Sequence, residues 1–95
     1  MYANVVTLNY KSPQDLEDAV RALAKQAEHF DKAPGFLSIN MVRTGPTQTV
    51  HTVVFDTEEN LLATREKMFP VLLEVTGPHV SAPPEQAPGE VLLHR

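Results

Sequence analysis

The fold is decided by the stretch Pro34-Gly35-Phe36-Leu37-Ser38-Ile39-Asn40-Met41-Val42-Arg43-Thr44-Gly45-Pro46-Thr47-Gln48-Thr49-Val50-His51-Thr52-Val53-Val54-Phe55. Its two arms are rich in β-branched and aromatic residues, which strands prefer. Pro34-Gly35 marks the start of the stretch, and Gly45-Pro46 marks a turn between the arms. The pattern predicts a β-hairpin at the centre of a small α+β domain.

The register of this hairpin depends on where the turn is centred. A turn centred on Gly45-Pro46 places Phe36 opposite Phe55 and Asn40 opposite His51. Strand side chains alternate between two faces. One face then carries Phe36, Ser38, Asn40 and Val42 with Thr49, His51, Val53 and Phe55. The other carries Leu37, Ile39, Met41 and Arg43 with Gln48, Val50, Thr52 and Val54. Both faces are largely apolar, which predicts that both are buried, and a slip of one residue would exchange the faces of one arm.

A strand and a helix are predicted ahead of the hairpin. Val5–Tyr10 is a short apolar run that we interpret as a strand. Ser12 can cap the helix that follows, and Pro13 suits its first position. Apolar residues spaced four and three apart then mark one helical face, namely Leu16, Val20, Leu23, Ala27 and Phe30. We expect this helix to end near Asp31, ahead of Pro34.

A second helix is predicted after the hairpin. It begins at Asp56-Thr57-Glu58-Glu59, where Asp56 or Thr57 can cap it. Its stripe consists of Leu61, Arg65, Met68, Leu72 and Val75. Pro70 falls inside this pattern, so we expect a kink or two helical pieces. Gly77-Pro78 ends the helix.

The remainder of the chain is predicted to be a proline-rich loop over residues 77–89 and a last strand over Glu90–His94. The resulting order, β-α-β-β-α-β, is that of a ferredoxin-like fold in a single domain spanning residues 1–95. Right-handed crossovers place both helices on one face of a four-stranded antiparallel sheet. The bare face would expose an apolar patch of Leu37, Ile39, Met41, Val50 and Val54. A patch of that kind predicts a homodimer that packs sheet against sheet.

Composition excludes several classes of function. The net charge is −4 without a basic cluster, which argues against nucleic-acid binding. There is no cysteine, and no cluster of histidines and carboxylates has the spacing of a metal site, so we expect no metal. No apolar run approaches the roughly 20 residues of a membrane span, and the N-terminus does not resemble a signal peptide. We therefore expect a cytoplasmic protein that does not bind membranes.

Two short motifs carry a resemblance to a known family. The motifs are Pro34-Gly35-Phe36-Leu37 and, after a strand ending at Phe55, the helix start Asp56-Thr57-Glu58-Glu59-Asn60-Leu61. In these features the chain resembles the antibiotic-biosynthesis-monooxygenase-like family of dimeric α/β barrels. Its members include cofactor-independent monooxygenases acting on polycyclic phenols, haem-degrading enzymes and proteins of unknown role. The resemblance implies no cofactor. Phe55 stands where family enzymes commonly have tryptophan, and the second helix lacks the histidine of the haem-degrading branch, so haem degradation is not expected.

The resemblance places a ligand pocket between the sheet and the helices, on the face that carries Phe55. Ser38, Asn40 and His51 share that face in the predicted register. A buried His51 with a pKa near neutral could take the proton of a phenol, while Asn40 orients the imidazole or the substrate oxygen. Alternatively, Asn40 and His51 simply hydrogen-bond to each other across the hairpin.

Further substrate contacts are predicted from Phe55, Ser38, Arg65 and Tyr10. Arg65 could bind a carboxylate or phenolate, or it could carry its charge to water along an apolar stem. Tyr10 could donate a hydrogen bond at the pocket rim, or it could pack without a site role. Two functions remain open: a cofactor-independent oxygenase or related isomerase acting on a small aromatic, and a non-catalytic barrel protein that binds a small ligand or is structural. An open pocket favours the first, and a core filled by aromatic side chains favours the second.

Overall fold

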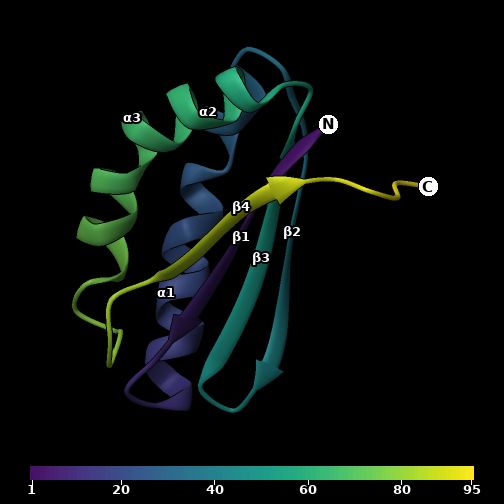
Figure 1. Ribbon diagram of the computed structural model, residues 1–95. Coiled ribbons are helices and arrows are strands. Elements are labelled where there is room, and N and C mark those ends of the chain that lie inside the picture. Colours follow the sequence, from purple (N-terminus) through teal and green to yellow (C-terminus); the bar gives the residue numbers. More distant parts are fainter.

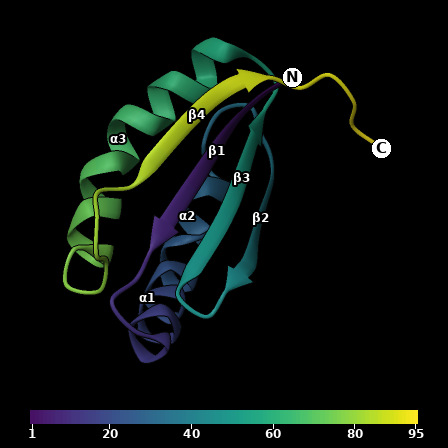
Figure 2. The same ribbon diagram turned by 60° about the horizontal axis from the view of Figure 1, so that its bottom comes forward.

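The computed structural model describes all residues, 1–95, and confirms the predicted fold class. The elements in chain order are β1 (Tyr2–Asn9), α1 (Pro13–Gln26), α2 (Glu28–Asp31), β2 (Phe36–Gly45), β3 (Gln48–Phe55), α3 (Glu58–Thr76) and β4 (Glu85–Glu90). The strands form one antiparallel sheet in the order β2-β3-β1-β4. Figures 1 and 2 show the helices together on one face of this sheet, so the other face is left open.

Both predicted helix starts are confirmed by their caps. The Ser12 hydroxyl accepts a hydrogen bond from the backbone N–H of Asp15 at 3.1 Å, and Pro13 is the first helical residue. The Thr57 hydroxyl accepts from the backbone N–H of Asn60 at 3.2 Å. The first helical segment is interrupted after Gln26, and the short α2 carries the chain to Asp31, where the helix was expected to end.

Helix α3 runs without interruption through Pro70. Proline removes one backbone donor and crowds the preceding turn, which usually bends a helix rather than dividing it when the rest is packed. Figure 1 shows that α3 curves along its length. The structure therefore has one curved helix where the sequence left open a kink or two pieces.

The predicted hairpin register is wrong by one residue beyond Phe36. Phe36 does pair with Phe55, but an irregularity before Ser38 shifts the arm, so that Met41 and not Asn40 lies opposite His51. The turn consists of Pro46-Thr47, between the paired residues Gly45 and Gln48. Proline is favoured at the first central position of a turn because its φ is already set, which moves the centre of the turn by one residue.

This slip exchanges the faces of β2. Asn40 lies opposite Thr52, and alternation places both on the open face of the sheet. Ile39 and Met41, which were predicted to be part of the open patch, line the space under the helices instead. The exposed apolar side chains on the open face are Val5 and Val42, with the half-buried Val50 between them, whereas Val54 is buried.

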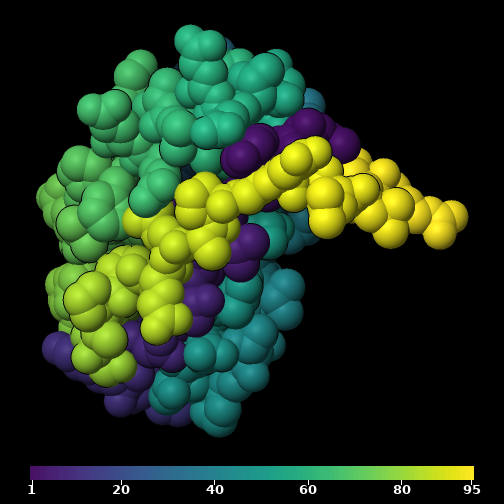
Figure 3. All heavy atoms as spheres, in the orientation of Figure 1, coloured from purple at the N-terminus to yellow at the C-terminus, as the bar shows by residue number.

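The predicted last strand is also wrong. The chain is irregular beyond Glu90, and β4 occupies Glu85–Glu90, which overlaps the predicted strand only at Glu90 and otherwise lies in the predicted loop. Pro88 is tolerated there because β4 is an edge strand that pairs with β1 alone. The tail beyond β4 projects from the domain in Figures 1 and 3, and its Leu92 and Leu93 are 90% and 81% exposed.

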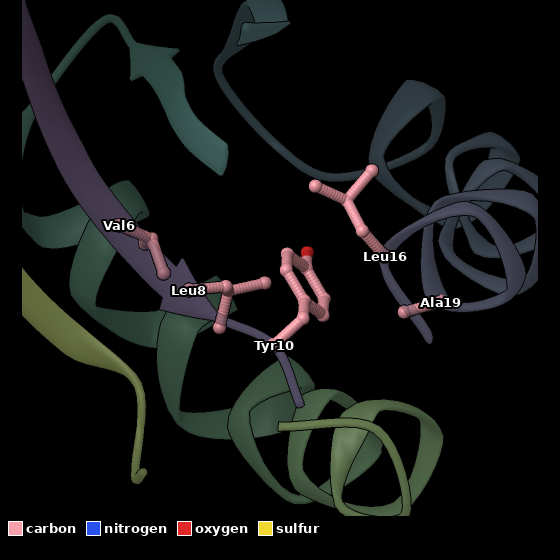
Figure 4. Close-up of a cluster of buried hydrophobic side chains, with 5 residues drawn as sticks. All are labelled: Val6, Leu8, Tyr10, Leu16 and Ala19. Carbon is pink, nitrogen blue, oxygen red and sulfur yellow. The ribbon is translucent and has the colours of Figure 1, made fainter. Parts of the chain in front are cut away.

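The core has two parts, which meet at the face of the sheet under the helices. The first joins β1 to α1 and contains Val6, Leu8, Tyr10, Leu16 and Ala19. Figure 4 shows the Tyr10 ring among these side chains. The second contains Val53, Phe55 and Leu61, with Phe36 against Phe55 in an edge-to-face arrangement at a centroid distance of 5.9 Å. Both parts contribute to the wall of the cavity described below.

Two local contacts hold loops to helix starts. Gly35 has φ +79°, and a Cβ at this position would overlap the side chains of Asp56 and Asn60 at the start of α3, so the Pro34-Gly35 turn requires glycine. The loop after α3 is tied to the start of α1 by the His79 imidazole Nδ1, which lies 2.9 Å from Asp15 Oδ1. The hydrogen bond from His79, with a second from Ser12, lowers the pKa of the Asp15 carboxyl.

Candidate functional site

A cavity of about 250 Å³ lies between the sheet and the helices. Its wall is mostly apolar and is drawn from every layer of the fold, for example Leu23 of α1, Phe30 of α2, Met41 of β2, Phe55 of β3, and Met68 and Leu72 of α3. Aromatic and methionine side chains thus border an open space rather than fill it. A concave apolar site with a few polar groups is the usual form of a small-ligand site.

The polar side chains on the cavity wall come from strands and helices alike. They are Asn4 of β1, Gln26 of α1, His51 of β3, Thr64 and Arg65 of α3, and Gln86 of β4. His51 is 7% exposed, and burial lowers the pKa of its imidazole to about 4. The expected near-neutral pKa is therefore wrong, and His51 is a neutral imidazole at pH 7. Its Nδ1 is buried without a hydrogen-bond partner.

Asn4 and Gln86 form a partly buried amide pair on the same cavity wall as His51. Asn4 Nδ2 donates a hydrogen bond to Gln86 Oε1 at 2.9 Å, and Asn4 Oδ1 has no partner. The sequence reasoning missed both residues as site candidates. The alternation of Asn4 with the buried Val6 and Leu8 was a signal that could have placed Asn4 inside, whereas Gln86 fell in a segment predicted to be a loop.

The structure brings three of the predicted site residues to the cavity, namely His51, Phe55 and Arg65. Asn40 and Ser38 do not line it, because the register shift turns them to the open face. Tyr10 does not line it either. Its hydroxyl is hydrogen-bonded to Thr49 Oγ1 at 2.8 Å within the core, and burial raises the pKa of the phenol. The predicted hydrogen bond between Asn40 and His51 is consequently absent.

Arg65 supplies the positive charge at the cavity. It is half-buried on α3, and it borders the cavity on one side and a shallow outer hollow beside Phe69 and Pro70 on the other. No carboxylate lies within ion-pair distance of its guanidinium. The chain holds no group of three histidine, cysteine or carboxylate side chains that could bind a metal ion. None of its helices has both the length and the apolar character needed to cross a bilayer.

No family model matches the chain, and no curated protein matches it at a significant level. Solved structures do match. A protein of unknown function from Nitrosomonas europaea is 20% identical, with a TM-score of 0.85 over 99% of this chain and 91% of that one. A candidate antibiotic biosynthesis monooxygenase from the same organism is 17% identical, with a TM-score of 0.81 over 96% and 89%. SnoaB, a cofactor-independent oxygenase from Streptomyces nogalater, is 15% identical, with a TM-score of 0.74 over 98% and 94%.

The chain has the antibiotic-biosynthesis-monooxygenase-like fold. The resemblance noted on the sequence around Pro34–Phe55 is thereby confirmed at the level of structure. Sequence identities of 15–20% support a shared fold but not a shared activity, since one fold supports many functions. What a chain with this fold does has to be argued from its own cavity.

Proposed function

We propose that this protein is a cofactor-independent oxygenase that acts on a small hydroxylated aromatic in the cavity under its helices. The observation that carries the proposal is the apolar space of about 250 Å³ with His51 and Arg65 on its wall. A cavity of about 150 Å³ accommodates benzene, so this one suits an aromatic of about two rings, such as a naphthol. SnoaB, an oxygenase without a cofactor, shares the fold.

The reaction needs no reductant from outside. A phenol and O2 give a quinone and water, because one oxygen atom enters the ring and the other leaves as water with two hydrogens of the substrate. The ring must first become electron-rich, which loss of the phenolic proton achieves. We assign the uptake of that proton to His51 on the cavity wall, and the unpaired Arg65 guanidinium would offer an opposite charge to the phenolate.

The low pKa of His51 sets a condition on this step. A neutral imidazole with a pKa of about 4 is a poor acceptor for an isolated phenol. Once the proton has moved, however, the phenolate beside the imidazolium favours the charged form, which raises the pKa of His51 in the complex. Proton transfer is therefore expected with substrate bound and not in the empty cavity.

The test is O2 uptake with a panel of one- and two-ring phenols that includes 1-naphthol. Replacing His51 with Ala should lower the rate by about 10²–10⁴-fold, the usual loss on removal of a general base. His29→Ala is the control, because His29 is exposed on α2 and does not line the cavity. Unchanged turnover in the His51 variant would show that this histidine is not the base.

A second candidate function is non-catalytic binding of the same class of ligand. Two observations favour it. By the family resemblance, Phe55 stands where enzymes commonly have tryptophan. Burial also lowers the pKa of the His51 imidazole to about 4, which makes the imidazole a weak proton acceptor. Calorimetric titration with 1-naphthol separates the two functions. Binding at the cavity without O2 uptake supports a carrier, and uptake supports the oxygenase.

We also propose that the protein is a homodimer formed through the open face of the sheet. Val5 on the central strand β1 and Val42 on β2 are exposed there, with Val50 between them on β3. Exposed apolar side chains on neighbouring strands are typical of a covered interface. Leu92 and Leu93 on the projecting tail are further apolar side chains that a second copy would cover.

Replacing Val5 with Lys should convert the dimer to a monomer, because the substitution buries an unpaired charge at the centre of the proposed interface. Size-exclusion chromatography with light scattering measures the change. Leu62→Lys serves as the matched control, since Leu62 is an exposed apolar residue on α3, on the helical side. A wild-type chain that is monomeric at micromolar concentration would refute the dimer.

A further inference from the structure

Two polar atoms beside the cavity are buried without partners, and their chemistry is complementary. Asn4 Oδ1 is an acceptor, and His51 Nδ1 can carry a proton and donate it. Buried polar atoms are almost always hydrogen-bonded, and each exception costs about 1–3 kcal/mol. Both atoms are shielded from solvent, so bulk water does not supply the missing partner.

The sheet register places these two residues as diagonal neighbours. Asn4 lies opposite Val53, and His51 lies opposite Val6, so Asn4 and His51 are on adjacent strands and on the same face. Diagonal neighbours on an antiparallel pair are roughly 7–8 Å apart, a span that two side chains of this length can bridge. The two atoms are not hydrogen-bonded to each other as they stand, so rotation about the side-chain bonds has to bring them together.

The orientation of the Asn4 amide is set by a third residue. Its Nδ2 donates to Gln86 Oε1 across the β1–β4 pair, so its Oδ1 is left to accept. Gln86 comes from the edge strand β4, 82 positions away in the sequence. With Gln86 in this orientation, a reversed Asn4 amide would lose this hydrogen bond and turn its Oδ1 toward Gln86 Oε1, so that two acceptors face each other.

We propose that Gln86 and Asn4 are positioning residues for His51. Gln86 holds the Asn4 amide, and Asn4 Oδ1 accepts a hydrogen bond from His51 Nδ1–H, which leaves Nε2 as the unprotonated nitrogen of the ring. Which nitrogen of a histidine carries the proton is set by the hydrogen bond that the other one makes. The role of the Gln86–Asn4–His51 contacts in turnover rests on the oxygenase proposed above, where Nε2 would receive the substrate proton. The tautomer of His51 does not depend on that function.

The test is the tautomer of His51, measured by 15N NMR on the full-length labelled protein without substrate at pH 7. The wild type should show His51 as the Nδ1–H tautomer. In Gln86→Leu the Asn4 amide is free to turn, and signals of the Nε2–H tautomer should appear. Gln86→Glu keeps an acceptor oxygen for Asn4 Nδ2 and should restore the wild-type pattern. Gln26→Leu is the control, because Gln26 also lines the cavity but is not hydrogen-bonded to Asn4.

The outcomes separate the two proposals. An Nε2–H tautomer in the wild type, or a Gln86→Leu variant with an unchanged tautomer, overturns the positioning role. The expected tautomers together with no O2 uptake by the wild type would support the positioning role and refute the oxygenase. Should Gln86→Leu fail to give a dispersed spectrum, Gln86→Met keeps the length of the side chain without the acceptor oxygen and takes its place.

Discussion

Replacing Phe55 with Ala should lower the free energy of unfolding by about 3–5 kcal/mol, the usual cost of removing a buried phenylalanine ring. Phe55 is 2% exposed at the end of β3, and its ring meets Phe36 edge to face at 5.9 Å. It also packs with Leu61 of α3, so it joins the sheet to the helix that covers it. The loss would remove much of the stability of a domain that typically has about 5–15 kcal/mol in total.

Phe55 borders the cavity, so the full loss of stability is expected if the space left by its ring stays open. The ring's volume would add to the existing cavity, and the cost of a substitution grows with the cavity that remains. Urea unfolding followed by circular dichroism measures the change. Leu73→Ala on the exposed side of α3 is the control and should cost under about 1 kcal/mol. A loss below about 1 kcal/mol for Phe55→Ala would contradict the packing described here.

Acid should destabilise the protein through His51 well before most carboxylates titrate. The imidazole has a pKa of about 4 when folded, against 6.5 for the unfolded reference, because burial disfavours its charged form. Between these values the unfolded chain binds a proton that the folded chain does not, so stability is present above pH 6.5 and is lost as the pH falls. The loss should reach about 2 kcal/mol at pH 5 and about 3 kcal/mol at pH 4.

The variant His51→Leu isolates this contribution. Urea unfolding of both proteins at pH 7.5 and pH 5 should show a smaller loss in the variant by about 2 kcal/mol. Arg65 is the other ionisable side chain on the cavity wall, and both proteins retain it. The Asp15–His79 pair is common to both proteins, so its contribution cancels in the difference. Equal losses in the two proteins would show that His51 is not desolvated in the fold.

The correct sequence predictions were those that depend on neighbours along the chain. Ser12 and Thr57 begin the two long helices as expected, because a cap is formed within one turn of the helix it starts. The hairpin arms were also found from their composition. The register was not, because irregularities between Phe36 and Ser38 and between Arg43 and Gly45 offset the pairing of β2 by one residue. An offset of one residue moves Asn40 to the other face of the sheet.

The sequence by itself determined the order of elements, the helix caps and the apolar faces of the helices, since these follow from local backbone preferences and from periodicity along one element. Only the tertiary structure decided the site. Asn4 and Gln86 meet because β1 and β4 pair, although they are 82 positions apart, and His51 joins them because β3 lies on the other side of β1. No local pattern records which strands pair, because pairing depends on how the whole chain buries its apolar surface.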